Sequence, residues 1–299
     1  VLTVLRQLPA VTAASPPVPP DPVGHFDFPD PAAVFDGRRY HAFGGASTMT
    51  SADLQHWGPR PEYLARSPAW ARDGSRGGAP SPPIRLPNGE WMIYYQADPK
   101  DCEQRPCGCI GAARSENGAG GPFVPTPEPV VCMPEEHGLV DGSARRVLLG
   151  SNESQPKSTV LYFKSTGFNT LARPARLWAG VLTNDGTRLA QPPINLLNQT
   201  AKWEARDGIG CIEAPSMLVQ ESEHTDVAPR FTLLYSGGDW TSGLNGLPYS
   251  IGYASCAGAL GPCTKRTVDQ PWFGPTFHGA VVCFVISQNY TAMPTFCLR

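Results

Sequence analysis

Three acidic residues stand in similar surroundings although they lie far apart in the chain. Asp30 occurs in DFPDPAAV, Asp141 in GLVDGS and Glu213 in CIEAPSM. All three adjoin apolar residues or proline rather than a charged run, a setting in which a carboxylate is unfavourable unless it is hydrogen-bonded or functional. Two carboxyls in opposite protonation states can cleave a glycosidic bond, and a third can raise the pKa of the proton donor. Any one of these acids alone could equally cap a turn or face solvent. The occurrence of all three in similar surroundings is what favours a catalytic role.

A recurring unit places the acids at equivalent positions. It consists of a turn that contains proline, a short apolar strand, a glycine turn, an aromatic strand, and a strand that ends in small and polar residues. The copies are 30–57; 79–97 with 109–123; 138–150 with 160–167 and 176–189; and 212–220 with 230–240 and 250–263. Repeated four-stranded units predict the radial blades of an all-β propeller, with a β-sandwich as the alternative fold. Opening strands of propeller blades line the central channel, so we expect the acids to share one pocket.

The composition excludes several other classes of protein. The chain has 299 residues, with 24 Lys and Arg against 26 Asp and Glu, which gives a net charge of −2. That balance argues against a nucleic-acid-binding protein, which needs a basic face. The 31 glycines and 33 prolines disfavour a helix bundle. No apolar run approaches the roughly 20 residues of a membrane span. We therefore expect no nucleic-acid or membrane partner, and a monomer.

The N-terminal sequence and the sequons predict export. Residues 1–23 resemble the remnant of a signal sequence followed by a proline-rich leader, although a mobile terminus would have a similar composition. Three N-x-S/T sequons begin at Asn152, Asn198 and Asn289. A secreted, extracellular glycoprotein is the prediction.

Nine cysteines also favour an oxidising compartment. The spacing of Cys256 and Cys263 predicts a disulfide that closes a loop. Cys102, Cys107 and Cys109 share one loop, with Cys132 as the expected outside partner. A zinc site made of these four thiolates is the alternative.

Four segments together resemble glycoside hydrolase family 43, whose members are five-bladed β-propeller enzymes that act on plant cell-wall glycans. The segments are DFPDPAAVFDGRRYHAFGG, APSPPIRLPNGEWMIYYQA, GLVDGS and IEAPSMLV, and the resemblance covers residues 24–279. It implies an inverting hydrolase in which Asp30 is the general base, Glu213 the general acid and Asp141 the residue that tunes the pKa of the acid. It also implies a plant polysaccharide or oligosaccharide as the substrate.

Further site residues follow from the same resemblance. Candidate sugar contacts are Phe28, Trp70, Ser81, Trp240 and His278. The aromatic residues among them could equally pack within or between blades. Ser81 stands where the family usually has an aspartate. The chemistry requires no cofactor, while His278 is a candidate ligand of a structural calcium ion.

The sequence departs from the family pattern after residue 279. The tail of residues 280–299 lacks the expected strands, which predicts an incomplete fifth blade. The predicted activity is that of an α-L-arabinofuranosidase or exo-arabinanase. The alternatives are a β-xylosidase, a carbohydrate-binding propeller without turnover, and a propeller scaffold for protein partners.

Overall fold

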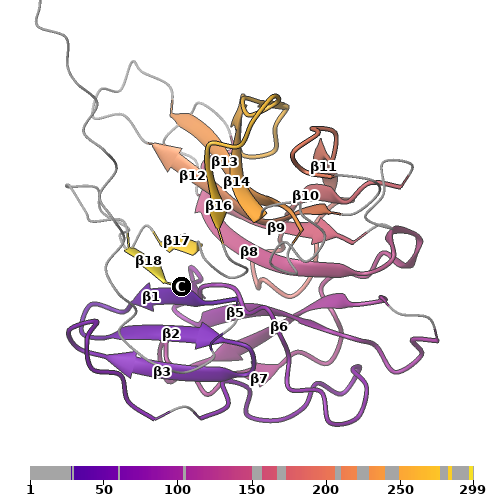
Figure 1. Cartoon of the computed structure of the whole chain (residues 1–299). Coiled ribbons are helices and arrows are strands. Elements are labelled where there is room, and N and C mark those ends of the chain that lie inside the picture. The colour runs from indigo at the N-terminus through magenta and orange to yellow at the C-terminus, as the bar shows by residue number, and fades with distance from the viewer. Residues whose placement is uncertain are drawn as a thin grey trace, which may run out of the picture.

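The structure, a computed structural model, is built almost entirely of antiparallel β-strands (Figure 1). It describes residues 28, 30–59, 61–103, 106–149, 157–166, 173–205, 210–220, 229–239, 249–276, 282–284 and 296–298. Within these residues the single helical element is a 3-10 turn, η1, at Pro134–Glu136. None of the described segments forms a helix with the length and hydrophobicity of a membrane span.

Four sheets follow one another along the chain as the blades of a propeller, which confirms the predicted fold class. Blade 1 contains β1 (Ala32–Phe35), β2 (Tyr40–Gly44) and β3 (Ser47–Ser51). Blade 2 contains β4 (Ile84–Arg85), β5 (Trp91–Ala97), β6 (Cys109–Ser115) and β7 (Val124–Pro125). In both blades each strand pairs with the next one in the sequence, so these blades are meanders.

The third and fourth blades have longer strands. Blade 3 contains β8 (Leu139–Val147), β9 (Ser158–Ser165), β10 (Arg176–Val181) and β11 (Ile194–Asn198). Blade 4 contains β12 (Cys211–Gln220), β13 (Arg230–Gly238), β14 (Tyr249–Cys256) and β15 (Cys263–Lys265), and β16 (Phe273–Thr276) also pairs with β14. These strands coincide with the four repeats expected from the sequence.

Apolar side chains from neighbouring blades form three separate cores. One core joins blades 1 and 2 around Phe43 and Tyr95, the next joins blades 2 and 3 around Tyr94 and Leu161, and the third joins blades 3 and 4 around Tyr162. Tyr94 and Tyr95 are adjacent on β5 and so face opposite sides of their sheet. Blades 2 and 3 each contribute to two of these cores and are therefore buried on both faces, as radial stacking requires.

The C-terminal tail contributes two short strands to the described residues. β17 (Val282–Phe284) and β18 (Phe296–Leu298) form an antiparallel pair, and β17 lies against β1 of blade 1 (Figure 1). The expectation of an incomplete fifth blade agrees with the four interpretable blades. The leader of residues 1–23 lies outside the described residues.

Candidate active site

The acidic residues occur near the start of the first strand of a blade, at or next to a backbone position that all four blades share. Asp30, Ala79, Asp141 and Ala214 all have positive φ, between 41° and 58°. A positive φ is uncommon for residues other than glycine and marks a local conformation held by its surroundings. The pairing of β8 with β9, and of β12 with β13, shifts register at this position. Such bulges redirect side chains, and here they lie beside the acids.

The repeat also fixes the relation between the acids. Asp30 and Asp141 occupy the position of positive φ itself, whereas Glu213 comes one residue before it in blade 4. The side chains of Asp141 and Glu213 nevertheless come close together, because Asp141 Oδ2 accepts a hydrogen bond of 2.9 Å from the backbone N–H of Ala214. Strand β8 is thereby tied to strand β12 across the boundary between blades 3 and 4.

Glu213 is surrounded by hydrogen-bond donors. Lys164 Nζ donates to Oε2 at 2.9 Å, and the Tyr249 hydroxyl donates to Oε1 at 2.7 Å. The Cys211 thiol is a further hydrogen-bonding neighbour. The exposed fraction of the side chain is 13% for Glu213 and 5% for Lys164, so this ion pair is shielded from solvent. Lys164 extends from β9 of blade 3 and therefore reaches a carboxylate of the next blade.

The environments of Asp141 and Glu213 shift their pKa values in opposite directions. Burial raises the pKa of Asp141 to about 7, and the charges of Glu213 and Asp30 act in the same direction. Burial would also raise the pKa of Glu213, but the ion pair with Lys164 and the hydrogen bonds from its neighbours outweigh burial and lower it. Of the two carboxyls, Asp141 is therefore the one that retains a proton to higher pH.

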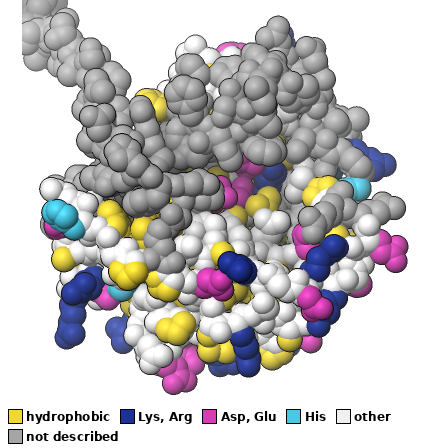
Figure 2. Space-filling model, turned by 60° about the horizontal axis from the view of Figure 1, so that its bottom comes forward, with side chains coloured by type: hydrophobic (Ala, Val, Ile, Leu, Met, Phe, Trp, Pro, Cys, Tyr) yellow, Lys and Arg dark blue, Asp and Glu magenta, His cyan; other side chains and the backbone are white. Residues whose placement is uncertain are grey.

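Asp30 completes the group from blade 1. It is exposed, and its charge acts on Asp141, so the two carboxylates lie within electrostatic range of each other. Acidic and basic side chains also meet in a recess of the molecular surface (Figure 2). Among the described residues, no group of three or more His, Cys, Asp and Glu side chains is arranged to hold a metal ion.

Comparison with solved structures identifies the fold. A thermostable family-43 glycoside hydrolase is similar with a TM-score of 0.62 and 19% identity, over 84% of this chain and 75% of that one. The endo-arabinase from Bacteroides thetaiotaomicron has a TM-score of 0.61 and 18% identity, over 82% of this chain and 81% of that one. The α-L-arabinofuranosidase from Lactobacillus brevis has a TM-score of 0.58 and 14% identity, over 80% and 72%. The fold is that of the family-43 glycoside hydrolases. No protein-family model and no curated protein matches the sequence.

Trp70 belongs to a packing arrangement that this propeller uses twice. In blade 2 its ring stacks on Tyr95 over Gly111, with ring centroids 6.3 Å apart. In blade 4 Trp203 stacks on Tyr235 over Gly252 in the same way, at 5.9 Å. A side chain on either glycine would collide with the rings, so the I-G-x-A sequences of the two blades leave room for the tryptophan. The repetition gives Trp70 a role in blade packing, and its sugar contact stays a prediction.

The other predicted sugar contacts lie in different places. Ser81 is 1% exposed, and its hydroxyl accepts from the Tyr94 N–H and donates to the Pro82 carbonyl, so it is engaged within blade 2. Phe28 is half-buried, and its ring packs against the backbone at Gly44. Trp240 and His278 lie outside the described residues, and so does the calcium site proposed at His278.

Three neighbours of Glu213 were missed by the sequence analysis: Lys164, Tyr249 and Cys211. Lys164 lies in a strand that is rich in aromatic and apolar residues, and Cys211 is a buried free cysteine. No sequence motif connects these residues with Glu213. The strand repeat offers the only signal, because the residue that pairs with the opening of each blade is polar in blades 2, 3 and 4: Gln96, Lys164 and Ser236.

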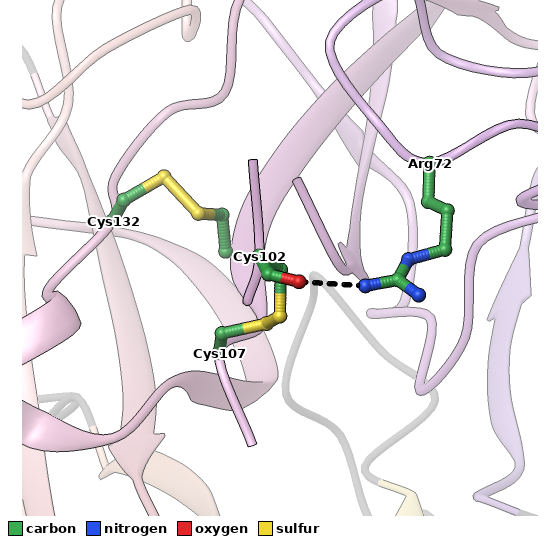
Figure 3. The surroundings of a disulfide bond; sticks show 5 residues. Arg72, Cys102, Cys107 and Cys132 are labelled. Carbon is green, nitrogen blue, oxygen red and sulfur yellow. Dashed lines mark hydrogen bonds between the residues drawn. A yellow bond between two sulfur atoms is a disulfide. The ribbon is translucent and has the colours of Figure 1, made fainter. Parts of the chain in front are cut away.

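The described part of the chain contains three disulfides. Cys102 bonds to Cys107 and Cys109 bonds to Cys132, which confirms that Cys132 pairs with one member of the cysteine-rich loop (Figure 3). Arg72 also donates to the carbonyl of Cys102 at 2.8 Å. The predicted loop closure by Cys256 and Cys263 is confirmed as well. These bonds replace the zinc alternative and indicate an oxidising compartment.

Proposed function

We propose that the chain is a secreted, inverting glycosidase that releases α-L-arabinofuranosyl units from plant cell-wall polysaccharides, as an arabinofuranosidase or exo-arabinanase. The observation that carries the proposal is the convergence of carboxylates from blades 1, 3 and 4, namely Asp30, Asp141 and Glu213, in a family-43 fold. An endo-arabinase and an α-L-arabinofuranosidase among the similar structures support the choice of sugar. Three disulfides support the extracellular location. We also propose a monomer with no nucleic-acid or membrane partner.

In the proposed reaction a water molecule attacks the anomeric carbon from the face opposite the leaving group. Asp30 accepts a proton from this water, and Glu213 donates a proton to the leaving glycosidic oxygen, so the configuration at the anomeric carbon inverts. One bond to carbon forms and one breaks, and the two carboxyls exchange protonation states. Acid–base chemistry of this kind requires no cofactor; a calcium ion near His278 would be structural.

The positions of Asp30 and Asp141 suit the proposed roles, while the protonation of Glu213 in the resting site differs from the one that the reaction requires. Asp30 is exposed at the edge of the group, where water can reach it, while Glu213 lies deeper and is held from two sides. Asp141 binds the backbone beside Glu213, which suits an orienting residue. In the resting site Asp141 retains a proton to higher pH than Glu213, whereas the proposed reaction requires a proton on Glu213 when the bond breaks.

Hydrolysis of p-nitrophenyl α-L-arabinofuranoside tests the proposal. We expect turnover by the wild type, and a loss of about a hundred- to ten-thousand-fold in both Asp30→Asn and Glu213→Gln. Asp36→Asn is the matched control, because Asp36 lies beyond the other end of β1, where it caps a turn and pairs with His41. Proton NMR of the first sugar released reports the anomeric configuration.

Other outcomes separate the alternatives. Turnover of the β-xyloside alone would make the protein a β-xylosidase. Sugar binding without turnover would make it a carbohydrate-binding propeller, and full activity in Asp30→Asn would remove Asp30 as the base. If the protein neither binds nor cleaves these sugars, the remaining alternative is a propeller scaffold for protein partners.

A further inference from the structure

The residue that pairs with Glu213 is a buried lysine from the neighbouring blade, and the mechanism above gives it no task. The Lys164–Glu213 contact is 2.9 Å long, and both side chains are largely removed from solvent. A buried ion pair contributes little net stability, because desolvation of both charges offsets their attraction. Removing one partner, in contrast, is strongly unfavourable, since it leaves the other charge uncompensated. The pair is therefore a device that fixes the position and the charge of Glu213.

We propose that Lys164 is a positioning residue that holds Glu213 as a carboxylate until substrate binds, and so sets the upper pH limit of proton donation by the Asp141–Glu213 pair. This inference rests on the proposed function of the site. In this role Lys164 controls how the proton is distributed between Asp141 and Glu213, and it does not contact the sugar.

The groups around Glu213 act as one network. Lys164 faces it from β9, Tyr249 from β14, Cys211 from its own strand β12, and Asp141 from β8. Asp30 acts on Asp141 from blade 1. Lys164 is the only cation that the structure places in this network of described residues, and it lowers the pKa of both Asp141 and Glu213. Its removal therefore shifts both groups in the same direction, toward retention of the proton at higher pH.

Repeat equivalence supports a specific role. Lys164 occupies the position held by Gln96 in blade 2 and by Ser236 in blade 4. A neutral polar residue is thus sufficient for the fold at this point of a blade. The charge is found in the blade that adjoins Glu213, where β8 and β9 both contact β12.

The pH dependence of kcat/KM in Lys164→Met and Lys164→Arg tests the proposal. In Lys164→Met we expect the alkaline limb to move to higher pH by about one unit or more, while the acidic limb, which reports Asp30, stays in place. Lys164→Arg retains the positive charge, so its alkaline limb should lie at the same pH as that of the wild type. The matched control is Lys265→Met, because Lys265 forms a similar buried ion pair with Glu204 in blade 4. This control should lower the melting temperature and leave the pH profile unchanged.

A second readout does not depend on turnover. In carbon-13 NMR of protein labelled at the glutamate carboxyls, the Glu213 signal is identified by its absence in Glu213→Gln. It should titrate below the ordinary glutamate range in the wild type and above that range in Lys164→Met. If the wild type cleaves no glycoside but this shift occurs, the proposed function and the pH limit assigned to it fail, while the effect of Lys164 on the ionisation of Glu213 stands.

Two results would overturn the proposal: an unchanged Glu213 titration in Lys164→Met, or an unchanged alkaline limb in an active Lys164→Met. Should Lys164→Met fold poorly, the double variant Lys164→Met/Glu213→Gln decides the point, because it removes both charges. We expect it to melt at a higher temperature than either single variant at pH 8. A double variant no more stable than the single ones would contradict the pairing.

Discussion

At the scale of single residues, Asp141 shows how the site stores a proton. Its carboxyl is buried beside two other acids, and its pKa is about 7 in the folded protein against 3.8 for an ordinary aspartate. The folded state therefore binds this proton more tightly than the unfolded chain does. The resulting stability is fully present below about pH 4 and is lost as the pH rises through 7.

Replacing Asp141 with asparagine should remove this pH dependence. We expect Asp141→Asn to abolish turnover and yet to be more stable than the wild type at pH 8, by up to about 4 kcal/mol. Urea unfolding at intervals between pH 4 and pH 8 measures the difference. Asp185→Asn is a control of opposite sign, because hydrogen bonding by Thr183 lowers the pKa of exposed Asp185. Parallel stability curves for the wild type and Asp141→Asn would contradict the assignment.

The residue scale also shows what the sequence could and could not reveal. The three acids were recognisable because proline or glycine and small residues recur beside them at the start of each repeat. Lys164 was not recognisable as a site residue, because its partner Glu213 lies 49 positions away and the contact depends on the register of β9 against β8. For Trp70 the sequence left two roles open, because a tryptophan in a loop can pack within a blade or contact a sugar. The packing role becomes visible once Trp203 is seen in the equivalent place.

At the scale of elements, the loop before blade 3 determines where Asp141 lies. The Leu139 N–H donates to the Gly108 carbonyl at 2.7 Å, so β8 begins against the cysteine-rich loop. The disulfide between Cys109 and Cys132 joins the start of β6 to the segment that leads into η1 and β8. This bond therefore supports the backbone that carries the carboxyl.

Removal of this disulfide should affect stability and activity together. We expect Cys109→Ala/Cys132→Ala to lower the free energy of unfolding by about 2–4 kcal/mol and to reduce kcat/KM at temperatures where the variant remains folded. The control is Cys256→Ala/Cys263→Ala, which opens a hairpin at the outer strands of blade 4. It should lower stability and leave kcat/KM unchanged. Equal losses of activity in both variants would show that β8 is positioned by other contacts.

The boundaries of strands could be predicted from the sequence where a turn has a recognisable sequence. The Asn88-Gly89 turn, with φ of 92° at the glycine, separates β4 from β5 as its sequence indicates. The bulges at Asp141 and before Ser216 were not predictable, because a register shift depends on the partner strand. The shared position of positive φ emerges only from the folded backbone.

At the scale of the whole molecule, the blades are joined by apolar cores and by single buried hydrogen bonds. The Tyr94 hydroxyl of blade 2 donates to the Gly186 carbonyl of blade 3 at 3.0 Å. The Tyr162 hydroxyl of blade 3 donates to the Ala259 carbonyl in blade 4, also at 3.0 Å. Both tyrosines occupy the same repeat position, opposite Ser81 and Ser143. Each hydroxyl thus fixes one blade against the next.

Removing these hydroxyls tests whether the blades unfold as one unit. We expect Tyr94→Phe and Tyr162→Phe each to lower the free energy of unfolding by about 1–2 kcal/mol, because a buried carbonyl loses its donor. Tyr40→Phe, at the half-buried start of β2, is the control and should have little effect. The losses should add in the double variant, since the two bonds lie in different interfaces.

If the blades are cooperative, urea unfolding followed by circular dichroism and by tryptophan fluorescence will give one coincident transition in all variants. Separate transitions in Tyr162→Phe would mean that blade 4 unfolds independently of the others, and Glu213 would then lose its partner Lys164 before the remaining blades unfold.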